Sequence, residues 1–196
     1  MSCGLRFVLL SAANLSTRNI FCELVLALLG SGVQAKAHLE ALSHVRKFDD
    51  VRVWSRNPEH AKRFAQEHGA VAMDAESAVR GADVIVTATS SHEPILKGMW
   101  LKPGAHVNAV GACIPIWREL DDDVMSNTVI VDSREAALKE SGDVILSKAE
   151  IYAEAGEIFA GIKTCPASDI TIFKSVGIAS EDLVAAKLVL QKHLAK

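Results

Sequence analysis

The sequence is poor in aromatic residues and carries no strong excess of charge of either sign. Aromatic residues make up 5% of its 196 residues, and the formal net charge at pH 7 is −3. No basic stripe is present, so the composition does not favour a nucleic-acid-binding protein. No apolar run reaches the ~18 residues that a membrane-spanning helix needs. We therefore expect a globular protein with neither a nucleic-acid nor a membrane partner.

Cysteine is scarce and scattered. The chain has four cysteines, Cys3, Cys22, Cys113 and Cys165, and no two of them form a Cys-x-x-Cys pair. This spacing favours neither a disulfide framework nor a metal site, so we expect free thiols, no metal and a cytoplasmic protein. A faint signal-peptide pattern near the amino terminus has an apolar stretch of about seven residues, at the lower limit of such signals, and we do not expect secretion.

The sequence is rich in Ala, Val, Leu and Gly, arranged as short apolar runs that alternate with longer amphipathic stretches. The apolar runs predict strands at 24–29, 51–54, 70–73, 83–88, 106–109, 128–131 and 170–173. The stretches between them predict helices at 33–47, 58–68, 74–80, from 133 onward, 149–159 and 180–194. Because such alternation requires right-handed crossovers between parallel strands, we predict a doubly wound parallel-sheet α/β fold, the Rossmann fold.

A glycine motif follows the first predicted strand and opens the first predicted helix. It reads Gly30-Ser31-Gly32-Val33-Gln34-Ala35, a G-x-G-x-x-A pattern. Gly30 permits a tight turn, Gly32 lets the backbone approach a pyrophosphate, and Ala35 lets the helix pack closely on the sheet. The helix amino terminus offers free N–H groups to the phosphates. The motif predicts a dinucleotide site, and an ordinary structural turn is the alternative.

The end of the second predicted strand indicates which dinucleotide is bound. NAD-binding proteins usually carry Asp or Glu there, whereas this chain has Trp54-Ser55-Arg56-Asn57. A carboxylate would repel a 2′-phosphate, but the guanidinium of Arg56 would donate charge-assisted hydrogen bonds to it. Ser55 and Asn57 would add neutral hydrogen bonds. We therefore predict NADPH as the cofactor, the alternative being that Arg56 is a solvated surface residue.

Small residues end two of the later strands, at 87–91 and 108–112. Ligands of open α/β sheets bind beyond the carboxyl ends of the strands. These small residues would let the adenosine and nicotinamide halves of the cofactor approach, although any strand end can be small and polar.

Several longer segments, in their order along the chain, resemble the ornithine cyclodeaminase/mu-crystallin family. They are G-S-G-V-Q-A, W-S-R, G-A-D-V-I-V-T-A-T, E-P-I-L, K-P-G-A-H-V-N-A-V-G-A, E-A-A-L-K-E-S-G-D-V, F-K-S-V-G and V-A-A-K. The resemblance extends over 23–192. It implies an NADPH-dependent ketimine reductase that acts on a cyclic imine carboxylate, also binds thyroid hormone, and works as a cytoplasmic homodimer.

The resemblance also implies contacts for individual residues. Along the cofactor these are Ser31, Val33 and Gln34 at the pyrophosphate, beside Gly30 and Gly32 of the motif, then Ser55, Arg56, Asn57 and His60 around the 2′-phosphate and adenosine, Thr89, Ser90 and Val110 further along, and Ser175 near the nicotinamide. Glu140 matches a position at the hormone and substrate pocket. Its own sequence context indicates only a solvated acid on a helix.

Two features depart from the family pattern. Cyclodeaminases have a catalytic aspartate where this chain has Cys113, which argues against ornithine cyclodeamination. We interpret Cys113 as a small buried filler, with a reactive thiol as the alternative. The second departure is at the amino terminus, where 1–22 resembles nothing in the N-terminal domain of the family. That domain supplies the basic residues that hold the substrate carboxylate and most of the dimer interface.

We therefore expect three parts: a divergent segment at 1–22, an NADP-binding Rossmann domain at 23–174, and a C-terminal helix at 175–196. The last helix and the segment after Gly142 would pack on a mostly missing second domain and would otherwise expose apolar faces. The chain resembles a truncated gene product, an alternative isoform or a mispredicted gene model. Three functions remain open: a ketimine reductase, a non-catalytic NADPH-regulated hormone binder, and an inactive fragment. No catalytic residue is assigned.

Overall fold

The computed structural model describes residues 23–165 and 169–194, in which a single parallel sheet forms the centre of the molecule. The strand order is β3-β2-β1-β4-β5-β8-β6-β7, and every pairing is parallel. The strands are β1 (Val25–Leu29), β2 (Asp50–Trp54), β3 (Val71–Ala72), β4 (Val84–Thr87), β5 (His106–Ala109), β6 (Thr128–Val131), β7 (Ile151–Glu154) and β8 (Thr171–Lys174). The predicted doubly wound α/β fold is confirmed.

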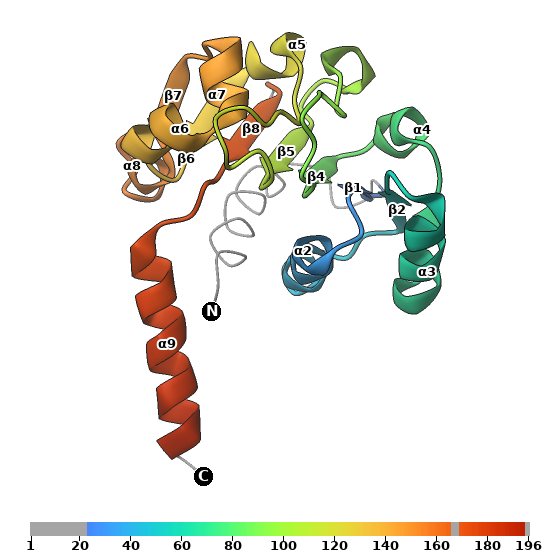
Figure 1. Cartoon of the computed structure of the whole chain (residues 1–196), viewed down its shortest axis with the longest axis horizontal. Helices are drawn as coiled ribbons and strands as arrows, with labels where there is room; N and C mark the ends of the chain where they lie inside the picture. The colour runs from blue at the N-terminus through green and yellow to red at the C-terminus, as the bar shows by residue number, and fades with distance from the viewer. Residues whose placement is uncertain (1–22, 166–168, 195–196) are drawn as a thin grey trace.

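Helices cover both faces of this sheet, and one helix extends away from it (Figure 1). They are α2 (Val33–Ser43), α3 (Pro58–His68), α4 (Ala75–Val79), the 3-10 turn η1 (Gly98–Trp100), α5 (Asp122–Met125), α6 (Arg134–Glu140), α7 (Gly142–Ser147), α8 (Ala155–Phe159) and α9 (Ala179–Leu194).

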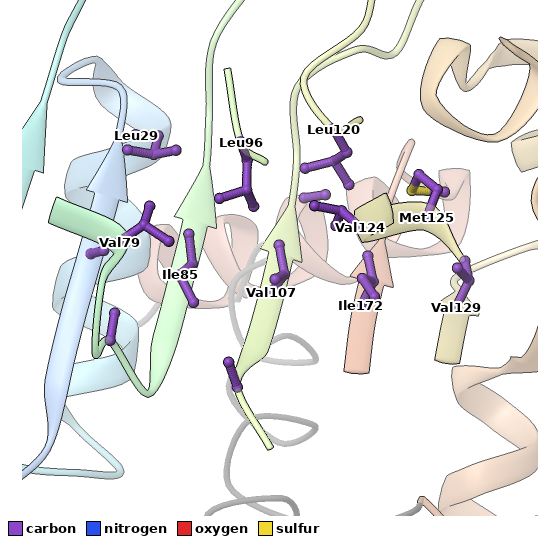
Figure 2. Packing of buried hydrophobic residues seen from close by; sticks show 14 of the residues in the cluster. Leu29, Val79, Ile85, Leu96, Val107, Leu120, Val124, Met125, Val129 and Ile172 are labelled. Atoms are coloured by element: carbon purple, nitrogen blue, oxygen red, sulfur yellow. The ribbon is translucent and has the colours of Figure 1, made fainter. Parts of the chain in front are cut away.

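Side-chain alternation along the strands sorts the core into two layers. Leu26 and Leu28 of β1 pack with α2 and α3 on one face. Ala27 and Leu29 face the other side, where they join the cluster containing residues of α4, α5 and η1. Figure 2 shows this second cluster, in which Ile85, Val107 and Ile172 of successive strands lie under Leu96, Leu120 and Val124. A run that is apolar at every position is therefore buried on both faces, as a parallel sheet requires.

Local capping explains where α3 and α6 begin and where α3 ends. The Asn57 side chain accepts a hydrogen bond from the Glu59 amide at 3.0 Å, and Ser133 accepts one from the Ala136 amide at 3.3 Å. Gly69 ends α3 in a left-handed conformation with φ 67°. These starts and stops agree with the predicted ones.

Two predicted helix boundaries were wrong. The segment 149–159 is not one helix, because β7 occupies most of its first half and α8 its second half. The Arg134 guanidinium donates to the carbonyl oxygens of Ile151 and Tyr152 at 2.7 and 3.2 Å, which covers this outer strand. Helix α2 ends at Ser43 rather than near 47, because the chain must return to the sheet. There Asp49 accepts a hydrogen bond from the Leu24 amide at 3.0 Å.

The segment after Gly142 contains both buried residues and, as predicted, exposed apolar side chains, with Leu146, Phe159 and Ile162 at 48%, 47% and 73% exposure. The first turn of α7 is buried, and so is Ala153 of β7, so this segment belongs to the sheet domain. By contrast, α9 exposes Leu183 (73%) and Val189 (70%). In the described part of the chain, no helix is long and apolar enough to cross a membrane, and no group of side chains could hold a metal ion.

Candidate functional site

The sheet order creates a crevice at the carboxyl ends of β1 and β4. From β1 the chain winds outward through β2 and β3, and then crosses back to β4 on the other side of β1. Ligands of doubly wound folds bind at such a reversal. A groove of about 480 Å³ opens there, lined by Gly30, Ser31, Gly32, Trp54, Ser55, Arg56, Asn57, His60, Arg63, Ala88, Thr89, Ser90, Ser91 and Ile95.

The glycine loop forms one wall of this groove. Gly30 has φ +126°, and a Cβ there would lie 2.5 Å from the carbonyl oxygen of Ala88, so only glycine fits. A Cβ at Gly32 would meet nothing within 4 Å, which leaves open space above the loop. Gly32 is the N-cap of α2 and offers no side-chain cap to the first turn. The free N–H groups of α2 can therefore bind an anion, so the loop fits a pyrophosphate.

Cationic and polar side chains form the opposite wall. Arg56 follows β2, while His60 and Arg63 are three residues apart on α3 and so lie on one face of that helix. No acidic side chain lines this groove, and within the described residues neither Arg56 nor Arg63 forms an ion pair. This wall fits a second, doubly charged phosphate. Arg63 was not predicted, although its spacing from His60 was a usable signal.

A second groove, of about 580 Å³, lies beyond the end of β5. It is lined by Gln34, Val110, Cys113, Ser175, Val176, Gly177, Ile178, Ala179, Asp182 and Ala185. Asp132, which was also not predicted, holds one side of it. Its Oδ2 accepts hydrogen bonds from Ser175 Oγ at 2.7 Å and from the amides of Val176 and Gly177 at 2.9 and 2.7 Å.

Cys113 and two of the predicted site residues, Val33 and Glu140, are exposed. Cys113 is exposed, so the prediction of a buried filler was wrong. It follows Ala112, whose φ of 50° turns the chain outward from β5. Val33 is 84% exposed on the first turn of α2 and lines neither groove. Glu140, at the end of α6, is also exposed and lines neither groove.

Three fully buried charged residues, Glu119, Asp143 and Lys174, lie at the same end of the sheet, and we call them the buried charge cluster. Lys174 Nζ lies 3.2 Å from Asp143 Oδ2. Burial raises the pKa of the Glu119 carboxyl, while the nearby Lys174 ammonium and the hydroxyl of Thr89 oppose the rise. The residues of this cluster are far apart in the sequence, and no local pattern predicts that they meet.

The model of the ornithine cyclodeaminase/mu-crystallin family matches 22–196. The chain belongs to this family. It is 56% identical to the ketimine reductase mu-crystallin of Macropus fuliginosus over 169 residues, which cover 84% of this chain and 54% of that protein. It is 37% identical to a Delta(1)-pyrroline-2-carboxylate reductase of Bacillus cereus, covering 85% of this chain and 57% of that protein. The resemblance inferred from the motifs is thus confirmed.

Two solved structures have the same fold as this chain. The Delta(1)-pyrroline-2-carboxylate reductase of Thermococcus litoralis, in complex with NADH and L-proline, matches with a TM-score of 0.85 and 34% identity over 98% of this chain and 65% of that one. An archaeal alanine dehydrogenase dimer with bound NAD matches with a TM-score of 0.84 and 32% identity over 98% of this chain and 64% of that one. The chain spans about half the length of the curated relatives it matches.

Proposed function

We propose that this chain is the cofactor-binding part of an NADPH-dependent ketimine reductase, which transfers hydride to a cyclic imine carboxylate. The observation that carries the proposal is the groove at the ends of β1, β2 and β4. There the glycine loop of 30–32 faces Arg56, His60 and Arg63, and no carboxylate lines the wall. A carboxylate at the end of β2 would favour NADH by binding the ribose hydroxyls, whereas guanidinium groups favour a 2′-phosphate.

The two grooves would hold the two halves of the cofactor. Ser31 and Gln34 would contact the pyrophosphate with the amides of α2, and Ser55, Asn57 and His60 would join Arg56 at the adenosine end. Thr89, Ser90 and Val110 would line the path between the halves. Ser175, whose hydroxyl is held by Asp132, would lie at the nicotinamide. The exposed Val33 would contribute its backbone amide.

The bound cofactor supplies the hydride, and the protein contributes orientation and electrostatics. The imine must be protonated, since an iminium carbon accepts hydride far more readily than a neutral imine. The described residues of the two grooves contain no basic side chain next to Ser175 that would hold a substrate carboxylate. We therefore assign no catalytic residue, and propose that the substrate carboxylate is bound by residues outside these two grooves.

We propose the domain boundary at 174 and 175, a family-type homodimer, and a cytoplasmic location. For thyroid-hormone binding, the one residue implied by the resemblance is Glu140, and its exposed position outside both grooves does not favour a hormone pocket within this chain. The segment 1–22 lies outside the described residues.

Arg56→Ala is expected to weaken NADPH binding by about 1–3 kcal/mol while leaving NADH binding nearly unchanged. The reason is that only NADPH carries the 2′-phosphate to which this guanidinium would donate. Fluorescence titration of the wild type and the variant with both cofactors measures the effect. Arg80→Ala removes an exposed guanidinium that pairs with Glu76 far from the groove, and it serves as the matched control. Equal affinity of the wild type for NADPH and NADH would contradict the proposed role of Arg56.

The proposed reaction is tested separately, by measuring turnover of piperideine-2-carboxylate with NADPH.

A further inference from the structure

The buried charge cluster lies beneath the two grooves, and packing alone does not explain it. Removing an ion from water costs several kcal/mol even when it is paired, and apolar residues of similar size often hold a core equally well. A hydrocarbon side chain cannot, however, form directed hydrogen bonds to particular loop atoms. The partners of Glu119, Asp143 and Lys174 therefore indicate what the cluster does.

Glu119 binds the loop that follows β4. Its Oε1 accepts hydrogen bonds from the amide and the hydroxyl of Thr89 at 2.6 and 2.7 Å, and its Oε2 accepts one from the hydroxyl of Thr87 at 2.9 Å. Thr89 lines the first groove, and the neighbouring Ala88 carbonyl abuts Gly30 of the glycine loop. The Glu119 carboxylate thus holds the loop with Ala88 and Thr89 in place against the glycine loop.

Asp143 and Lys174 hold Glu119 and the loop after β5. Asp143 Oδ1 accepts hydrogen bonds from the amides of Glu119 and Leu120 at 2.8 and 3.0 Å. Lys174 Nζ pairs with Asp143 Oδ2 and donates to the carbonyl oxygen of Gly111. Lys174 also ends β8, immediately before Ser175 of the second groove. The cluster therefore connects the strand ends that form both grooves.

We propose that Glu119 is a positioning residue, supported by Asp143 and Lys174, which holds the loop at 88–91 in the conformation that the dinucleotide requires. This inference rests on the proposed function, because it concerns the same groove. Glu119 acts through Thr89 and does not touch the cofactor. If its loss lowers the competent fraction of the loop to about a tenth, the apparent Kd for NADPH rises about tenfold.

The test compares Glu119 with a buried carboxylate at the opposite end of β4. Asp83 is also buried, its Oδ2 accepts a hydrogen bond from the Val25 amide at 2.9 Å, and its Oδ1 lies 2.8 Å from Lys102 Nζ. Asp83→Asn therefore matches Glu119→Gln in chemistry but not in location. Glu119→Met is the stronger variant, because it keeps the length of the side chain and removes every acceptor.

Two readouts are measured on the full chain: NADPH titration, which gives Kd separately from the number of sites, and hydrogen exchange at the Thr89 amide without cofactor. Glu119→Met should raise Kd about tenfold, leave the NADPH-to-NADH ratio unchanged because Arg56 is intact, and speed exchange at Thr89 about tenfold. Glu119→Gln should give intermediate changes. Asp83→Asn should lower stability yet keep the wild-type Kd and the wild-type exchange at Thr89.

The inference is overturned if Asp83→Asn raises Kd as much as Glu119→Gln does, because the effect would then be one of general stability. It is also overturned if the Glu119 variants keep the wild-type exchange rate at Thr89. Should Glu119→Met fail to fold, the comparison of the two amide variants decides. Absence of NADPH binding by the wild type would refute the proposed function, and the exchange measurement would still decide whether Glu119 orders the loop.

Discussion

Replacement of Lys174 by methionine is expected to lower the free energy of unfolding by about 3–5 kcal/mol. Methionine fills much the same space without the charge, so the loss reports the ammonium rather than a cavity. Lys174 is fully buried and pairs with Asp143. Without it, two carboxylates, those of Asp143 and Glu119, remain buried with no cation in the cluster. An uncompensated buried charge is among the most destabilising changes a core can receive.

The deficit of Lys174→Met should depend on pH. Lys174 lowers the pKa of the Glu119 carboxyl and burial raises it, so the pKa rises further in the variant. When the pKa of a carboxyl is higher in the folded than in the unfolded state, the free energy of unfolding falls as pH rises. The reason is that the folded protein binds the proton more tightly than the unfolded chain does. Denaturant unfolding at pH 5 and pH 7.5 should therefore show the larger deficit at pH 7.5.

Lys102→Met is the control for this prediction. Lys102 also pairs with a buried carboxylate, that of Asp83, but its own side chain is 33% exposed. Water can reach the site and replace part of the lost interaction, so the cost should be smaller. A loss for Lys174→Met no greater than that for Lys102→Met at pH 7.5 would contradict the account of the cluster.

Acidification from pH 6.5 to pH 4 is expected to destabilise the fold by about 3 kcal/mol through His106 alone. His106 lies at the start of β5 in the centre of the sheet, with Nδ1 at 2.8 Å from Thr171 Oγ1 and Nε2 at 3.2 Å from Asn108 Oδ1. Burial lowers its pKa from 6.5 to about 4, although the hydrogen bond to Asn108 acts in the opposite direction. Between these two values the unfolded chain binds a proton that the folded chain cannot, so stability falls as pH falls.

His106→Gln should remove this part of the pH dependence while retaining polar contacts to Thr171 and Asn108. Unfolding measured at pH 6.5, 5 and 4 gives the comparison, and the difference between the wild type and the variant cancels the contribution of the buried His38, whose pKa is also lowered by burial. His92→Gln changes an exposed histidine and should leave the profile unaltered. Parallel wild-type and His106→Gln profiles would exclude His106 as the source.

The strands and the glycine loop could be predicted from the sequence because their signals are local. A buried run such as 83–88 predicts a strand by itself, and the loop of 30–35 directly follows a strand and opens a helix. The prediction of a helix at 149–159 was wrong because it, too, used only local signals. The apolar spacing of this segment suits a helix. Its first half nevertheless forms strand β7, because it pairs with β6 and is covered by Arg134. Those partners are distant in the sequence.

In the candidate site, too, the residues with a local sequence signal could be predicted and the others could not. Arg56 could be found because it stands at a fixed place after β2, and Arg63 could have been found from its helical spacing to His60. Glu119, Asp143 and Lys174 could not, since they come from a loop, from α7 and from β8, and only the folded sheet brings them together. Nor does the sequence predict that Asp132 after β6 would hold Ser175 after β8.

The position of β8 has a consequence for how the chain is made. This last strand in the sequence lies in the interior of the sheet, between β5 and β6, and pairs with both. During synthesis the strands of two half-sheets, β3-β2-β1-β4-β5 and β6-β7, are therefore made before β8. The edges of β5 and β6 that face each other have no strand to pair with until Thr171–Lys174 emerges from the ribosome. Such open edges invite pairing with other chains, and long-range strand pairing is slow. A nascent polypeptide halted before Thr171 should aggregate, whereas one released after Lys174 can complete its hydrogen-bonded centre.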